Sequence, residues 1–104
     1  MATVTARQDL EIETKYVPPR SATEERLAAL WAAQLGVFPV GVDDDFFELG
    51  GDSLFAAELL LTMDGEFGVE IPAWTLFLSP TIAQIAQAIV DIRRSADEAR
   101  ATAA

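Results

Sequence analysis

The chain has 104 residues, of which 51% are hydrophobic, and this combination predicts one small soluble domain with a single core. Its 17 acidic and 7 basic residues give a formal net charge of -10, which argues against duplex nucleic acid and against an anionic membrane surface as partners. Because the chain has no cysteine and no histidine, disulfides, thiolate nucleophiles, imidazole bases and Cys/His metal sites are excluded.

The sequence shows neither a membrane span nor a secretion signal. No apolar run approaches the roughly 18 residues that cross a bilayer, and residues 1–8 lack the apolar stretch of a signal peptide. We therefore expect a cytoplasmic protein that holds no metal ion.

The negative charge is concentrated in the middle of the chain. Between Leu27 and Ile92 there are ten acidic residues and no basic one, whereas the remaining seven acids are balanced by seven bases. One interpretation is a solubilising surface, and the other is a negative face that attracts basic partners.

The first predicted elements are a tail and a helix. Residues 1–20 mix charge signs and end in two prolines, which predicts a flexible N-terminal tail. The first helix is expected to begin near Ser21, because Ser21 to Glu24 forms a capping box, and to end at Gly36.

A long connection follows, over residues 36–51. Loops longer than about 12 residues in a compact domain are usually functional or disordered. This one contains large apolar side chains, which we expect to pin it onto the helices: Phe38, Phe46, Phe47 and Leu49.

Three further helices are predicted. The second runs over residues 53–67 and stops at Gly68, and a short one covers residues 73–78 with Trp74 and Phe77 as anchors. The last is capped by Ser79, with Pro80 as its first helical residue. Residues 95–104 contain no large apolar side chain and are expected to form a flexible C-terminal tail. The fold class is therefore all-α, with three main helices, one short helix and a long first loop.

The second helix carries two apolar stripes. At about 100° per residue, one stripe is wide enough to be the core face, and it contains Ala56, Leu59, Leu60, Met63 and Phe67. The other contains Leu54, Ala57 and Leu61, flanked by Glu58 and Asp64. Since a helix of a small domain buries one face, the second stripe is either a docking surface or is covered by the long loop.

Ser53 lies where a glycine pair ends and the second helix begins. The glycines leave space around the hydroxyl, and a helix N-terminus favours a negative group such as a phosphodiester by roughly 0.3 to 1 kcal/mol. Taken alone, however, a serine that only caps the helix is the simpler interpretation. The spacing excludes a Gly-x-Ser-x-Gly nucleophile, a P-loop and a calcium loop, whose sixth position would be Glu48.

Residues 16–92 resemble a peptidyl carrier protein of nonribosomal peptide synthesis. The resemblance rests on Asp-Phe-Phe-Glu-Leu-Gly-Gly-Asp-Ser-Leu at residues 45–54, supported by Leu30-Trp31, residues 67–72 and residues 79–82. It implies a four-helix carrier fold over residues 21–94, in which Ser53 is the modified serine and Gly51 and Asp52 belong to the cofactor site.

The resemblance also implies a function. A phosphopantetheinyl transferase would move 4'-phosphopantetheine from coenzyme A to Ser53, and the thiol of that arm would hold an aminoacyl or peptidyl thioester. The carrier would catalyse nothing and, as a monomer, would present its cargo to adenylation, tailoring or condensation enzymes. The docking residues implied by the family are Leu54, Ala57, Glu58, Leu61, Phe77 and Leu78.

Two departures from the family pattern bear on context. Asp52 occupies the position at which carriers that feed a condensation domain more often have histidine. An aspartate at this position resembles carriers that serve epimerisation domains or that stand alone. Residues 1–20 lack the Gly-Lys-x-Asp-Arg ending of an adenylation domain, which favours a free-standing (type II) carrier over the alternative of a domain taken from a larger protein. The alternatives are an acyl carrier protein of polyketide or fatty-acid type and a small acidic adaptor that only binds proteins. An acidic cation-binding protein is disfavoured by the loop spacing.

Overall fold

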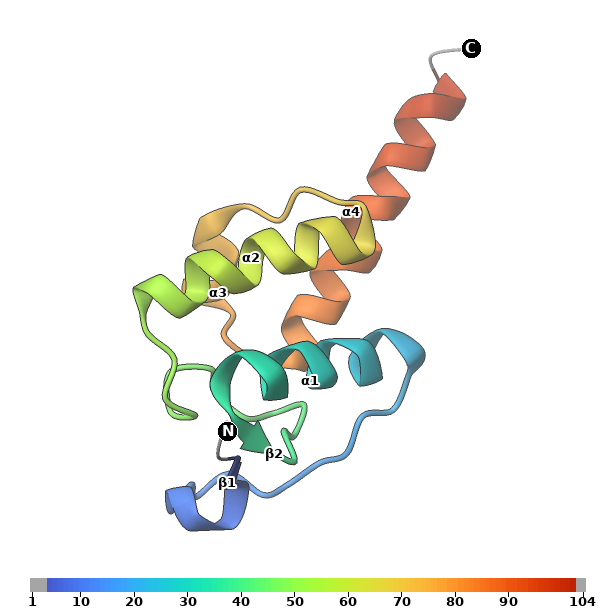
Figure 1. The fold of residues 1–104 in the computed structure, drawn as a ribbon. Helices are drawn as coiled ribbons and strands as arrows, with labels where there is room; N and C mark the ends of the chain where they lie inside the picture. The colour runs from blue at the N-terminus through green and yellow to red at the C-terminus, as the bar shows by residue number, and fades with distance from the viewer. Residues whose placement is uncertain (1–3, 103–104) are drawn as a thin grey trace.

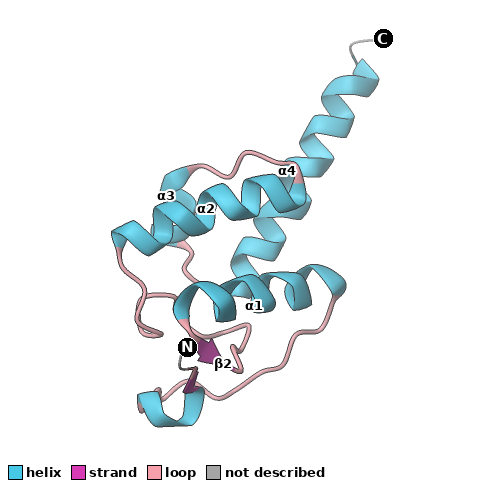
Figure 2. Ribbon diagram, in the orientation of Figure 1, coloured by secondary structure: helices cyan, strands magenta, loops and turns pink. Residues whose placement is uncertain are grey.

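The computed structural model describes residues 4–102, and helices dominate it (Figures 1 and 2). The elements in chain order are β1 (Thr5–Ala6), η1 (Arg7–Leu10), α1 (Ala22–Leu35), β2 (Val37–Phe38), α2 (Ser53–Phe67), α3 (Ala73–Leu78) and α4 (Ile82–Thr102). In Figure 1, α2 lies above α1, α3 lies beside α2, and α4 begins behind α1, passes behind the end of α2 and continues away from the other helices. The predicted arrangement of three main helices and one short helix is confirmed.

The ends of α1 and α2 follow the capping rules that predicted them. Ser21 Oγ accepts a hydrogen bond from the Glu24 N–H at 3.2 Å, which begins α1. Gly36 and Gly68 end α1 and α2 with φ of 68° and 65°, a left-handed conformation that glycine adopts without steric cost. The sequence therefore located both helices correctly.

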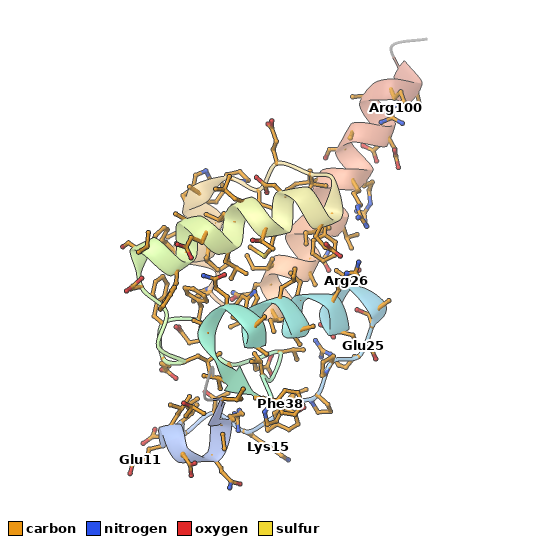
Figure 3. The ribbon with its side chains drawn as sticks, in the orientation of Figure 1. Glu11, Lys15, Glu25, Arg26, Phe38 and Arg100 are labelled. Atoms are coloured by element: carbon orange, nitrogen blue, oxygen red, sulfur yellow. The ribbon has the colours of Figure 1, made fainter. Side chains whose placement is uncertain are left out.

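The core lies between α1, α2 and α4. It is built from buried side chains of all three helices and of the long loop, including Leu27, Trp31, Phe46, Leu59 and Ile85. Phe46 and Leu49 pin the loop as predicted, and Phe47 is half-buried against the core. The expectation for Phe38 was wrong: this ring is exposed (Figure 3). It lines a surface pocket together with Tyr16.

The N-terminal segment contacts the domain instead of standing apart from it. β1 pairs in parallel with β2, with Thr5 opposite Val37, and the Thr5 N–H donates to the Gly36 carbonyl at 2.7 Å. Further along, the Val42 N–H donates to the Val17 carbonyl at 2.9 Å. This differs from the predicted tail, because local composition gives no sign of a partner segment some 30 residues away.

The last helix differs from its prediction at both ends. Pro80 is not yet helical; its carbonyl accepts from the Phe46 N–H at 2.8 Å, and Thr81 Oγ1 accepts from the Gln84 N–H at 3.3 Å near the start of α4. The helix then continues to Thr102, so that residues 95–102 of the predicted flexible tail are helical. Alanine is the strongest helix former, and no glycine or proline interrupts this stretch. Within residues 4–102, no helix is long and apolar enough to cross a membrane.

Candidate functional site

The loop before Ser53 is held by its own side chains. Asp45 Oδ1 accepts from the N–H groups of Phe47 and Glu48 at 2.8 and 3.3 Å, which closes a turn. The ring of Phe46 is fully buried and meets Trp31 edge-on, with ring centroids 5.3 Å apart. Phe47 stacks on Phe77 of α3 at 5.5 Å. The two adjacent phenylalanines therefore tie the loop to the core and to α3.

The two glycines are required by the backbone and by Phe46. Gly50 has a φ of 104°, a conformation that side chains rarely tolerate. A Cβ added to Gly51 would lie 2.2 Å from Cε1 of the Phe46 ring. Gly51 was predicted to leave space around the hydroxyl of Ser53, and the structure supplies a second reason, which is the close approach of Phe46.

Asp52, and not Ser53, caps α2. Asp52 Oδ1 accepts a hydrogen bond from the Phe55 N–H at 3.0 Å, and Asp52 has the extended backbone of an N-cap residue. Ser53 is the first residue of the helix and is exposed. The simpler interpretation of Ser53 as a cap is therefore wrong. Its side chain is exposed at the positive end of the helix dipole, where a negatively charged group is stabilised.

The second stripe of α2 lies open to solvent. Leu54 and Leu61 are 66% and 76% exposed, and Ala57 is exposed between them. The alternative that the long loop covers this stripe is wrong. Glu58 Oε2 accepts from Gln34 Nε2 at 2.7 Å and so leans toward α1. Asp64, expected to flank the stripe, instead accepts from the Ile71 N–H at 3.0 Å.

The short helix α3 adds apolar surface beside this stripe. Leu78 is 73% exposed, and Phe77 is about half exposed. Trp74 was expected to be an anchor, but it is largely exposed, one helical turn before Leu78. We call the exposed apolar residues of α2 and α3 the outer surface: Leu54, Ala57, Leu61, Trp74, Phe77 and Leu78. Sequence spacing did not place Trp74 on this surface, because six residues are too few to define a helical face.

Two buried carboxylates are paired with arginines. Hydrogen bonds from the Arg20 guanidinium lower the pKa of Glu24, which is buried at the start of α1. Asp44 in the loop is paired with Arg7, and this hydrogen bonding raises the pKa of Arg7 further above its usual value. Neither pair involves the acids nearest Ser53.

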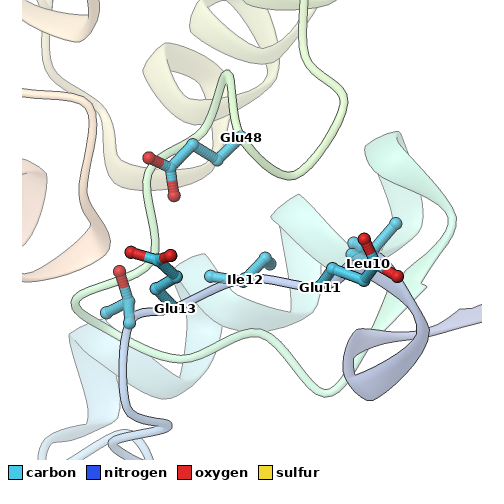
Figure 4. Close-up of a pocket in the computed structure, with 6 residues that line it drawn as sticks. Leu10, Glu11, Ile12, Glu13 and Glu48 are labelled. Carbon is cyan, nitrogen blue, oxygen red and sulfur yellow. The ribbon is translucent and has the colours of Figure 1, made fainter.

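The acidic residues near the site do not form a metal centre. Glu11, Glu13 and Glu48 line an open pocket of about 400 Å³ between the N-terminal segment and the loop (Figure 4). Within residues 4–102, no group of acidic side chains is arranged to hold a metal ion.

Comparisons with known proteins identify the family. The family described as "Phosphopantetheine attachment site" matches residues 25–89. Gramicidin S synthase 2 of Brevibacillus brevis is 49% identical over 78 residues, which are 75% of this chain and 2% of that protein. Tyrocidine synthase 3 of Brevibacillus parabrevis is 47% identical over 79 residues, which are 76% of this chain and 1% of that protein.

A solved structure gives the same result. A peptidyl carrier protein in complex with the phosphopantetheine transferase Sfp and coenzyme A has a TM-score of 0.72 and 39% identity. The match covers 73% of this chain and 99% of the carrier. The chain therefore belongs to the phosphopantetheine-attachment family, and it is a peptidyl-carrier-like domain. The predicted family, fold and cofactor are confirmed. The chain spans only a small part of the synthetases that it matches.

Proposed function

We propose that this domain carries an aminoacyl or peptidyl group in nonribosomal peptide synthesis, on a 4'-phosphopantetheine arm attached to Ser53. A transferase would join Ser53 Oγ to the phosphorus of the arm. The bond to the adenosine bisphosphate part of coenzyme A would break as the hydroxyl loses its proton. The arm supplies a thiol for thioester formation, which is consistent with a chain that has no cysteine. The domain's own residues position the serine and catalyse no step.

The observation that carries this proposal is the exposed Ser53 side chain beside a helix cap made by Asp52. Because Asp52 satisfies the Phe55 N–H, the serine is not needed to stabilise the helix. The fixed loop before it, with Phe46 buried against Gly51, holds the hydroxyl at a defined place. Gly51 and Asp52 therefore support the cofactor site by positioning Ser53 rather than by binding the arm.

The outer surface supports docking of partner enzymes close to the arm. It presents apolar side chains at the start of α2 and on α3, with Glu48, Asp52 and Glu58 exposed around it. Such a surface suits partners with a basic rim and an apolar centre. The transferase, an adenylation enzyme and the tailoring or condensation enzymes are the proposed partners, and the domain is expected to act as a monomer.

The chemistry of the cargo separates this function from its alternatives. Acyl carriers of polyketide or fatty-acid synthesis use the same arm, but the relatives reported above are peptide synthetases, which favours an amino acid. An adaptor that only binds proteins would need no free serine at the start of α2.

The test is modification by coenzyme A and a promiscuous phosphopantetheinyl transferase, followed by intact-mass analysis. We expect one phosphopantetheine on the wild-type protein and none on Ser53→Ala. Ser95→Ala is the matched control, because Ser95 is an exposed serine on α4 far from the loop, and it should be modified normally. A folded wild-type protein that gains no mass would contradict the carrier function.

A further inference from the structure

The proposed function does not explain the buried charge of the loop before Ser53. Asp44 lies in the loop before Ser53 and is fully buried, and its only charged partner within residues 4–102 is Arg7 of η1. Arg7 Nε donates to Asp44 Oδ2 and Arg7 Nη2 to Oδ1, both at 2.6 Å. This two-point geometry is the strongest way in which an arginine holds a carboxylate.

The Arg7–Asp44 pair joins two segments that are 37 residues apart in sequence. On the N-terminal side, Arg7 Nη2 also donates to the Thr14 carbonyl at 2.6 Å, and the guanidinium lies 5.3 Å from the Tyr16 ring centroid. On the loop side, Asp44 Oδ2 also accepts from the Gly41 N–H at 2.8 Å. The N-terminal segment is therefore held on the loop by this network of hydrogen bonds.

On the loop side, the hydrogen-bonded residues of this network lie in the same loop as the residues that position Ser53. Asp44 is two residues before Phe46, whose ring fills the space next to Gly51. The neighbouring Val42 bonds through its N–H to Val17 and through its carbonyl to the Ala83 N–H, at 2.9 and 3.0 Å. The loop position is thus fixed from the N-terminal segment at one end and by the cap of α2 at the other.

Removing Arg7 would leave a carboxylate buried without a counter-ion. Such a charge is strongly destabilising, and the protein relieves it by letting water reach the group. The least costly way to admit water here is local opening of the loop, because the helices have their own core contacts. An open loop no longer places Phe46 against Gly51, so Ser53 loses its fixed position.

We propose that Arg7 is a positioning residue for the modification of Ser53, because it neutralises Asp44 and so holds the loop in the conformation that the transferase accepts. This inference rests on the proposed function. If only the closed loop is competent, the apparent affinity falls in proportion to the closed fraction. The chemistry on the closed form is unchanged, so KM rises while kcat stays the same.

The experiment compares Arg7→Met with the wild-type protein. We expect the amide exchange of Val42 and Phe46 to accelerate at least about tenfold, with no comparable change at Ile89 of α4. We expect the transferase KM for this domain to rise at least about threefold at unchanged kcat. Arg20→Met is the matched control: it also unpairs a buried carboxylate, Glu24, but at the far end of α1, and it should leave KM unchanged.

A second substitution tests the cause. Adding Asp44→Asn to Arg7→Met removes the unpaired charge, and KM should return most of the way to the wild-type value. If Arg7→Met does not fold, Arg7→Lys decides, because lysine keeps the charge without the two-point contact and should raise KM by a smaller factor. A KM that is unchanged in the folded Arg7 variant would overturn the inference, even if loop exchange accelerates. If the wild-type protein is not modified at all, it is the proposed function that fails.

Discussion

One face of α2 packs against the core, whereas the opposite face is open to solvent, although leucines occur on both. Leu59 and Met63 on the inner face are fully buried, and Leu54 and Leu61 on the outer face are mostly exposed. The type of side chain therefore does not distinguish the two faces. The angular position of each residue on the helix does distinguish them. The inner face contributes to the folding free energy, and the outer face is the one that we propose for binding of partner enzymes.

The largest expected effect is on the inner face. Leu59→Ala should lower the free energy of unfolding by about 2 to 5 kcal/mol, because it removes buried methyl groups and leaves a cavity. Urea denaturation followed by circular dichroism measures this change. A loss below about 1 kcal/mol would show that the inner face is not the core face.

The glycine next to the site should give the next largest effect. Gly51→Ala forces a Cβ into the Phe46 ring and should cost about 1 to 3 kcal/mol of unfolding free energy. Gly65→Ala is the matched control, since nothing lies within 4 Å of a Cβ at this position inside α2. That control should be neutral or stabilising by up to about 1 kcal/mol. Equal losses of unfolding free energy in the two variants would mean that contact with the Phe46 ring is not the reason for glycine at position 51.

A substitution on the outer face of α2 should affect partner binding without affecting the stability of the fold. Leu61→Lys should change the unfolding free energy by less than about 0.5 kcal/mol, because the side chain is exposed. It should nevertheless reduce the kcat/KM of a partner enzyme about tenfold, since it puts a charge into an apolar contact. Val90→Lys, on the exposed side of α4, should leave partner activity unchanged. Unfolding of Leu61→Lys would instead show that the outer face is part of the fold.

The smallest expected effect is the pH dependence from Glu24. The folded-state pKa of Glu24 lies below its ordinary value of 4.5, chiefly because Arg20 hydrogen-bonds its carboxylate. The resulting stability is present above about pH 4.5 and is lost as the pH falls through the lowered pKa. Arg20→Met should flatten the stability profile below pH 4.5, as measured by denaturation at several pH values. If the slope of stability against pH below pH 4.5 is unaltered in this variant, the Arg20–Glu24 pair is not the source of the pH dependence.

Much of the fold could be predicted because its signals are local. The Ser21 cap, Gly36 and Gly68 located α1 and α2, and the helical period separated the two faces of α2. The contacts of the N-terminal segment could not be predicted, since the Arg7–Asp44 pair joins distant residues and neither residue is unusual in its local context. Phe38 lies in β2 opposite Ala6 of β1, and a pair of two-residue strands cannot be predicted from local sequence signals.

At the candidate site, the sequence predicted Ser53 as the attachment residue but did not predict that a neighbouring residue caps the helix. A serine before a helix is most often a cap, and only the geometry shows that Asp52 performs this role. The glycine pair was recognised as a motif, while its physical cause, the ring of Phe46 packed on Gly51, required the fold. Flexibility of the two ends of the chain stays a prediction.

The central claim is that Ser53 is the attachment residue, and fragmentation mass spectrometry of the modified protein tests it most directly. After reaction with coenzyme A and the transferase, the peptide that spans the start of α2 should carry one phosphopantetheine, with fragment ions placing it on Ser53. Finding the group on Ser21, Ser79 or Ser95, or on no residue of the folded protein, would contradict the account.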